Sequence, residues 1–119
     1  MPIDPAALLV VYKSLYLANE TIGGLQAALN NSPLPCDALD LQDKLADMET
    51  EKDELIAMRD QLKSGALVLP PPDNGLMTTL QGLVVQVEKA TQASASASAW
   101  LSLAGTVLDT GIAVMGLPS

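Results

Sequence analysis

The side chains that most often carry out catalysis are scarce in this sequence. There is no histidine, which removes the commonest general base and many kinds of metal site. Cys36 is the only cysteine, and without a histidine it lacks its usual activating partner, so we interpret it as a small residue at a helix start. The glycines form neither of the phosphate-binding patterns GxxxxGKS/T and GxGxxG. The sequence therefore predicts no catalytic residue, no cofactor and no enzymatic activity.

Carboxylates are the one abundant type of reactive side chain, and some of them are regularly spaced. Four aspartates separated by three, three and four residues fall on one face of a helix: Asp37, Asp40, Asp43 and Asp47. One helix supplies oxygen ligands from one side only and no EF-hand loop is present, so we expect no metal site. A solvent-exposed acidic face is the simpler interpretation, and a contact surface for a basic partner is the functional one. The candidate partner-binding residues of this segment are Asp40, Asp43, Asp47, Glu51 and Glu54.

The aromatic residues are few, namely Tyr12, Tyr16 and Trp100. Three rings are too few for a platform on which nucleic-acid bases stack. Tyr12 and Tyr16 are four residues apart and share a helix face, which suits the edge of a core and an interface anchor equally. We include all three aromatic residues as candidate anchors for a partner protein.

The charge of the whole chain is strongly negative. It carries 14 Asp and Glu against 6 Lys and Arg, a formal net charge of −8, and has no cluster of basic residues. Nucleic-acid binders draw most of their affinity from cations that neutralise phosphates, so we expect no nucleic-acid partner. An acidic surface attracts a basic protein surface instead. The single cysteine and the lack of basic residues before the first apolar run favour a cytoplasmic location.

Helices are the elements that must position these residues. Hydrophobic residues make up 49% of the chain, mainly Leu, Ala, Val and Met with no Phe, and such residues favour helices over sheets. Prolines and glycines divide the sequence into helices over about 4–30, 37–64 and 75–116, with a proline-rich connector over 66–73. We predict a single all-α domain over 1–119. It is an antiparallel bundle of three long helices with heptad-like seams, or of four if the third segment folds back.

Apolar residues recur every seven residues in the first two segments, as in the seams of packed helices. The seam positions of the first segment are Leu8, Val11, Leu15, Ala18, Ile22, Leu25 and Leu29. Those of the second segment are Ala38, Leu41, Leu45, Met48, Lys52, Leu55, Arg59 and Leu62, where the two basic residues would lay their aliphatic stems along the seam. Asp4 is the expected cap of the first helix and Gly65 the expected end of the second. Gly23-Gly24 predicts a kink or a close helix crossing.

The third segment is longer than its neighbours and contains alternating Ala and Ser over 92–99. Because alanine favours helix, we interpret this stretch as a thin helix that permits a neighbour to approach closely, with a loop as the alternative. A single helix over 75–116 would reach about 60 Å, against about 40 Å for each of the others, so they could not cover it completely. The segment therefore either breaks near Ala99 or Gly105 and folds back, or its C-terminal half meets a second copy, a partner or a membrane.

The stretch from Ala90 to Leu117 contains one charged residue, Asp109, and is long enough to span a membrane. Asp109 would lie near the middle of the apolar part and would cost about 2.5–3.5 kcal/mol on insertion. No Lys or Arg flanks the far end as an anchor. A buried helix in a bundle or oligomer is therefore favoured over membrane insertion.

These patterns together predict a non-enzymatic protein-binding module, such as a small adaptor, chaperone or immunity-like inhibitor. It would use the acidic helix face to attract a basic partner and the apolar C-terminal helix to bury surface against it. Self-association is the simplest way to cover the apolar C-terminal region, so we also predict a homo-oligomer, most simply a dimer. The alternatives are a small membrane-associated protein that inserts its C-terminal helix and a structural homo-oligomer subunit.

Overall fold

Four helices account for nearly all of the described part of the chain. The computed structural model describes residues 5–31, 35–67, 74–93 and 96–116. The helices are α1 (Pro5–Asn30), α2 (Pro35–Ser64), α3 (Asn74–Gln92) and α4 (Ala97–Met115), and these described ranges contain no strand. The prediction of an all-α fold is therefore confirmed. The expected cap Asp4 and most of the connector over 66–73 lie outside the described residues.

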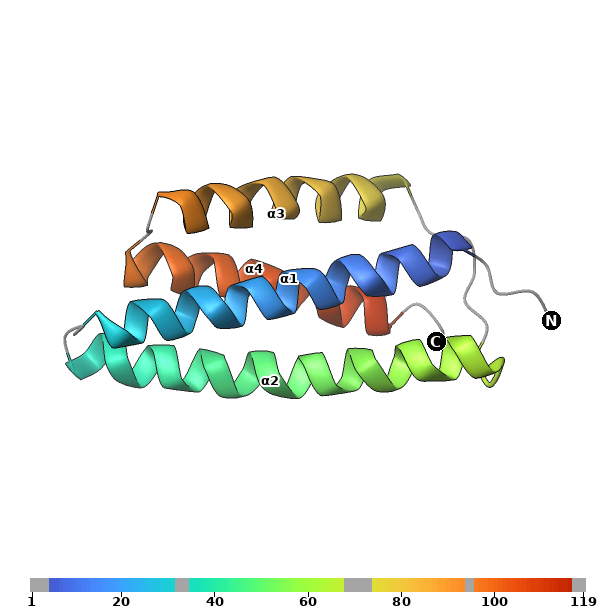
Figure 1. Ribbon diagram of the computed structural model, residues 1–119, viewed down its shortest axis with the longest axis horizontal. Coiled ribbons are helices and arrows are strands. Elements are labelled where there is room, and N and C mark those ends of the chain that lie inside the picture. The colour runs from blue at the N-terminus through green and yellow to red at the C-terminus, as the bar shows by residue number, and fades with distance from the viewer. Residues whose placement is uncertain (1–4, 32–34, 68–73, 94–95, 117–119) are drawn as a thin grey trace.

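The helices lie lengthwise in a bundle that measures 51 × 23 × 19 Å, and each begins at the end of the bundle at which the preceding helix stops (Figure 1). α1 packs against the other three helices, and so does α4. α2 and α3 lie on opposite sides of this central pair, and their described residues make no backbone contact with each other. The first and the last of the four helices therefore hold the bundle together.

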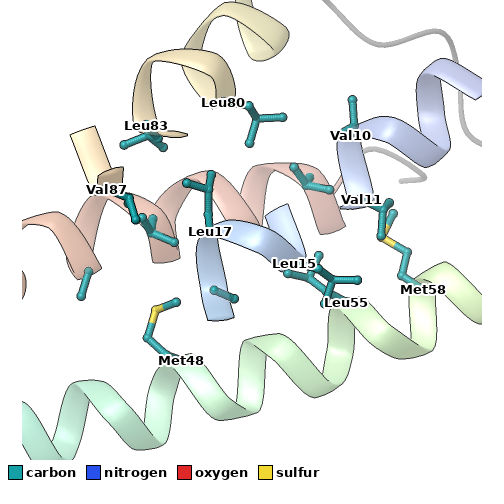
Figure 2. Packing of buried hydrophobic residues seen from close by; sticks show 14 of the residues in the cluster. Val10, Val11, Leu15, Leu17, Met48, Leu55, Met58, Leu80, Leu83 and Val87 are labelled. Atoms are coloured by element: carbon teal, nitrogen blue, oxygen red, sulfur yellow. The ribbon is translucent and has the colours of Figure 1, made fainter. Parts of the chain in front are cut away.

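The hydrophobic core lies along α1, because this helix packs against three neighbours and buries side chains over a broad face. Val10, Leu17 and Leu25 of α1 are all at most 1% exposed. Side chains of α2 and α3 reach this face from opposite sides, as Figure 2 shows for Met48 and Leu80. Full burial of an aliphatic side chain of this size stabilises a fold by about 1.5–3 kcal/mol. Leu, Val and Met thus fill a core that contains no phenylalanine.

On α2, the column of residues predicted at seven-residue intervals is buried, but its companion column differs from the predicted one. The buried column consists of Leu41, Met48, Leu55 and Leu62. Its buried companions are Glu51 and Met58, whereas the predicted companions Lys52 and Arg59 are only half-buried. Both companion columns lie about one turn from the first, on its two sides, so the spacing does not choose between them. As a result, a glutamate faces the bundle.

Two glycines have different roles: Gly24 of α1 makes room for a side chain of α4, and Gly65 follows the last residue of α2. Gly24 lies against the indole ring of Trp100 of α4, and a Cβ atom at Gly24 would overlap that ring, whereas one at Gly23 would meet open space. At Gly24 the missing side chain makes room for the Trp100 ring of the neighbouring helix. Gly65 has a φ of +81°, which favours glycine, and its N–H donates to the carbonyl of Leu62 at 3.3 Å. The predicted end of the second helix is thus also confirmed.

The third segment is divided into two helices, which corrects the single helix expected over 75–116. α3 ends at Gln92 and α4 begins at Ala97, so the break falls within the stretch of Ala and Ser. Ser96 caps α4, since its hydroxyl accepts a hydrogen bond from the N–H of Ala99 at 3.3 Å. Folding back allows α4 to bury Trp100 and other apolar residues against its neighbours. This burial outweighs the preference of alanine for a continuous helix.

Candidate functional site

A groove runs between α2 and α4 and brings acidic and apolar side chains together. Its volume is about 490 Å³. α2 contributes Lys44, Asp47, Thr50, Glu51 and Glu54, and α4 contributes Gly105, Leu108, Asp109, Ile112 and Met115. Spacings of mostly three or four residues place each set on one face of its helix. The groove therefore combines four carboxyl groups and one ammonium group with an apolar wall.

The groove continues toward the C-terminal end of α2. An adjoining hollow of about 300 Å³ is lined by Ala57, Met58, Gln61 and Leu67, together with Glu54 and Met115, which line both spaces. Between Lys44 and Gln61, α2 rises by about 26 Å at the standard rise per residue. This length would accommodate a helix of about four turns from a partner, in the manner of helix-in-groove recognition.

Glu51 differs from the other acidic residues of the groove because its carboxyl group is buried. The residue is 4% exposed, and its Oε1 atom has no hydrogen-bond partner among the described residues. Taking an ionised carboxylate out of water without pairing it costs several kcal/mol, so burial favours the neutral form. Burial therefore raises the pKa of the Glu51 carboxyl group to about 7, and the negative charges of Glu54 and Asp109 add to the rise. Near neutral pH, this group changes its protonation state.

Gly111 of α4 provides the space that the carboxyl group of Glu51 occupies. A Cβ atom at Gly111 would overlap Oε1 of Glu51. At Gly105, which lies on the same helix, a Cβ atom would have no other atom within 4 Å. Any side chain at Gly111 would thus force the glutamate out of its position, whereas an alanine at Gly105 would be accommodated.

The structure brings three of the five acidic candidates together and leaves the other two apart. Asp47, Glu51 and Glu54 line the groove. Asp40 and Asp43 are exposed nearer to the N-terminal end of α2 and do not line it. The predicted acidic face is therefore split into a groove portion and an exposed portion.

The three aromatic candidates lie away from the groove. Tyr12 and Tyr16 are exposed on α1, where Lys63 Nζ lies 5.6 Å from the centre of the Tyr12 ring. The Tyr16 hydroxyl donates to Oε1 of Glu88 on α3 at 3.4 Å. Partial burial raises the pKa of the Tyr16 hydroxyl, and the negative charges of Glu20 and Glu88 add to the rise. The tyrosines remain accessible to a partner.

Trp100 is 3% exposed, because its ring packs on Gly24 in the core. Its position leaves no accessible ring surface of the kind that an interface anchor needs. Of the three aromatic candidates, only Tyr12 and Tyr16 are therefore exposed enough to contact a partner.

Sequence reasoning did not select three residues that form the groove or hold Glu51 in place: Asp109, Gly111 and Ile112. They lie on α4, far from α2 along the chain, and no spacing rule says which faces of the two helices meet. Ile112 is 62% exposed, which is high for a large aliphatic side chain on a packed helix. The one available signal was Asp109, the only charge between Ala90 and Leu117.

Nothing in the described part of the chain suggests a metal centre, and no relative points to another site. The described residues contain no group of three or more His, Cys, Asp or Glu side chains that could hold a metal ion. Cys36 is exposed in the first turn of α2. Comparisons of the chain with protein families, with curated proteins and with solved structures find no match. The groove between α2 and α4 is therefore the candidate site.

Proposed function

We propose that this chain is a non-enzymatic protein-binding module, acting as a small adaptor, chaperone or inhibitor, and that its partner presents a basic surface. The observation that carries the proposal is the groove between α2 and α4, where acidic and apolar side chains line one surface. Charged groups at an interface guide encounter and determine specificity, and apolar groups at its centre supply burial. The groove offers both to a partner helix or extended segment.

The distribution of charge supports a basic partner. α2 contains nine of the 14 carboxylates and four of the six cations of the chain, a local net charge of −5. A field of this kind accelerates association with a basic surface, most strongly at low salt. The lack of histidine supports a role in binding without catalysis.

Capture of partners from a native lysate, with charge-matched variants, tests the proposal. Asp47→Lys with Glu54→Lys reverses two charges that line the groove, and Glu49→Lys with Asp53→Lys reverses two exposed charges of α2 that do not line it. Both pairs change the net charge equally, so a general charge effect would act on both. We expect mass spectrometry to identify a basic protein that the wild type and the second pair capture and the first pair loses at least tenfold. A set of captured proteins identical for all three would contradict the proposal.

A third pair of substitutions determines whether the exposed part of the acidic face takes part. Asp40→Lys with Asp43→Lys makes the same charge change outside the groove. Because these residues extend the negative field beyond the groove, we expect weaker capture of the same basic protein, with a smaller loss than for the groove pair. Unchanged capture would restrict the contact surface to the groove.

The proposal also covers how the helices pack, how many copies of the chain associate and where in the cell the protein acts. We propose an antiparallel bundle with heptad-like, coiled-coil-type seams that forms a dimer in the cytoplasm. On α4, Ile112 is 62% exposed and lies beside Leu108 and Met115 along the groove, which supports an association face on this helix. The presence of one cysteine supports a reducing compartment. Sedimentation equilibrium is expected to give twice 12.4 kDa, and a monomer at all micromolar concentrations would contradict the dimer.

A membrane-associated protein is the second candidate function, because one feature favours it. By length and composition, α4 is the one described helix that could cross a membrane, and 33% of its apolar window is buried inside the bundle. In this alternative, α4 would leave the bundle and insert. Flotation with lipid vesicles tests it: recovery of the protein with the vesicles would favour insertion, and recovery in the soluble fraction would exclude it.

A further inference from the structure

We propose that the groove between α2 and α4 binds one cationic side chain of the partner, a lysine ammonium or an arginine guanidinium, against Glu51. The inference rests on the proposed function and specifies the chemistry by which the partner is recognised. It also predicts that recognition depends on pH near neutrality.

Two independent observations point to a ligand at this place. The first is the set of carboxylates that line the groove around Glu51, namely Asp47, Glu54 and Asp109. The second is Glu51 itself, which is 4% exposed, lines the same groove and has an Oε1 atom without a hydrogen-bond partner. Buried polar atoms in native proteins are nearly always hydrogen-bonded. A donor that enters the groove would give the Glu51 carboxyl group the partner it lacks.

The surroundings favour an organic cation with an aliphatic stem. Leu108, Ile112 and Met115 form an apolar wall along the groove, against which the methylene groups of Lys or Arg can pack. The described residues contain no set of side chains suited to a metal ion. The volume of about 490 Å³ exceeds what a single ion needs and suits a long side chain with part of its backbone. Arginine adds a planar array of donors that matches carboxylate oxygens.

The negatively charged groups around Glu51 favour its neutral form until a cation arrives. The groove places Asp47 and Glu54 of α2 and Asp109 of α4 near it, and Lys44 of α2 is the one cation that lines the groove and acts in the opposite direction. α1 also packs against α2 but contributes no residue to the groove. Burial and the negative neighbours Glu54 and Asp109 hold the proton on Glu51 in the free protein by raising its pKa. A cation at hydrogen-bonding distance reverses this balance and favours the carboxylate.

The binding step conserves charge. A neutral carboxyl group and an incoming ammonium or guanidinium group become a carboxylate–cation pair, and one proton passes to the solvent. The partner side chain keeps its own proton, because both types of cation remain charged at neutral pH. Binding should therefore tighten as the pH rises, since more of the free protein has already lost the Glu51 proton.

A pair of small probes tests this inference without the natural partner. n-Butylguanidinium carries the head group and aliphatic stem of arginine, and n-butylurea has nearly the same shape without the charge. In 15N–1H correlation spectra, we expect n-butylguanidinium to shift the amide signals of Gly105, Asp109 and Ile112, which line the groove. We expect its affinity to be about tenfold higher at pH 8 than at pH 6, because the ionised fraction of Glu51 rises about tenfold across a pKa of about 7. Equal shifts with n-butylurea, or equal affinity at both pH values, would overturn the inference.

Glu51→Gln assigns the pH dependence to one residue. The variant keeps the size of the side chain but cannot ionise, so we expect weaker n-butylguanidinium binding that no longer changes between pH 6 and 8. Glu49→Gln is the matched control, because Glu49 is exposed on the same helix and does not line the groove. Retained pH dependence in Glu51→Gln would overturn the assignment. If this variant failed to fold, the two wild-type comparisons would still decide the matter.

The failure of this inference can be distinguished from failure of the proposed function. If Asp47→Lys with Glu54→Lys abolishes capture of a basic protein while n-butylguanidinium does not bind the groove, the cation site is wrong and the proposed function stands. If n-butylguanidinium binds as expected while capture of a basic protein is insensitive to the same two substitutions, the cation site stands and the proposed function is wrong.

Discussion

Glu51 links the folding of this protein to pH, because its proton is held much more tightly in the folded state than in the unfolded chain. Its pKa rises from 4.5 to about 7 on folding. Between these values the folded protein binds the extra proton, so the free energy of unfolding falls as the pH rises through this window. The fold therefore accepts this carboxyl group at lower cost while it is neutral, and ionisation of the group between α2 and α4 destabilises the folded state.

Replacing Glu51 with Gln should therefore remove a stability penalty that appears at alkaline pH. We expect Glu51→Gln to match the wild type near pH 5 and to exceed it at pH 8 by about 1–3 kcal/mol, since each tenfold change in proton affinity corresponds to about 1.4 kcal/mol. Urea unfolding followed by circular dichroism at both pH values measures the difference. Glu49→Gln, on the exposed side of the same helix, should show no such change. Equal stability of wild type and Glu51→Gln at pH 8 would contradict the effect.

A side chain at Gly111 would displace the Glu51 carboxyl group, whereas one at another glycine of the same helix would displace nothing. In Gly111→Ala the methyl group would overlap this carboxyl group, which ends a flexible side chain and can move aside, so we expect a loss of only about 1 kcal/mol in the free energy of unfolding. In Gly105→Ala the methyl group meets no atom, so the higher helix propensity of alanine should stabilise the protein by up to about 1 kcal/mol. Thermal and urea unfolding of both variants test the contrast. Combining Gly111→Ala with Glu51→Ala should recover part of the loss, and no recovery would argue against the contact.

At the scale of the helices, the crossing of α1 and α4 depends on one of two adjacent glycines. Gly24→Ala would push a methyl group into the Trp100 ring and should destabilise the protein by about 1–3 kcal/mol. In Gly23→Ala the methyl group would point into open space, so we expect the free energy of unfolding to rise by about 0.5–1 kcal/mol. The fluorescence of Trp100 distinguishes the two, because only Gly24→Ala should shift its emission to longer wavelength. The same emission from both variants would show that the ring does not pack there.

The helices that could be predicted from the sequence are those whose breakers and periodicity agree. The buried column of Leu41, Met48, Leu55 and Leu62 followed from spacing, and Gly65 followed from helix-ending chemistry. The companion column did not, because Glu51 on one side and Lys52 with Arg59 on the other are charged residues of types that cores normally exclude. The break at Ser96 also could not be decided locally, since alanine favours helix and serine favours a cap.

The acidic residues of the candidate site were selected from the sequence by number, whereas its α4 side was predicted only as an apolar helix. Asp47, Glu51 and Glu54 could be selected because they lie close together on one helix. The residues of α4 that complete the groove, such as Asp109 and Ile112, join them only through tertiary packing. Which helix faces meet is decided by the burial of the whole core, and periodicity along one segment does not contain that information.

Across the whole molecule, the helices differ in how many neighbours they contact and how many side chains they bury. α3 contacts α1 and α4 but not α2, and in its described part it buries only Leu80, Leu83 and Val87. Local opening is easiest where few apolar contacts must be broken. We expect the backbone amides of α3 to exchange with deuterium faster than those of α1, by a factor of ten or more. Equal protection of the two helices would mean that the bundle opens only as a unit.

The contact between Gly24 and Trp100 has a consequence for the order of events during synthesis. The ribosome releases α1 first among the four helices and α4 last, yet these two form the central pair of the bundle. Until α4 has emerged, part of the apolar surface of α1 stays in water and is open to chaperones or to other nascent chains. Docking of α4 is then the closing step of folding. Trp100, the only tryptophan, leaves water in that step, so its emission can time the completion of the fold on a translating ribosome.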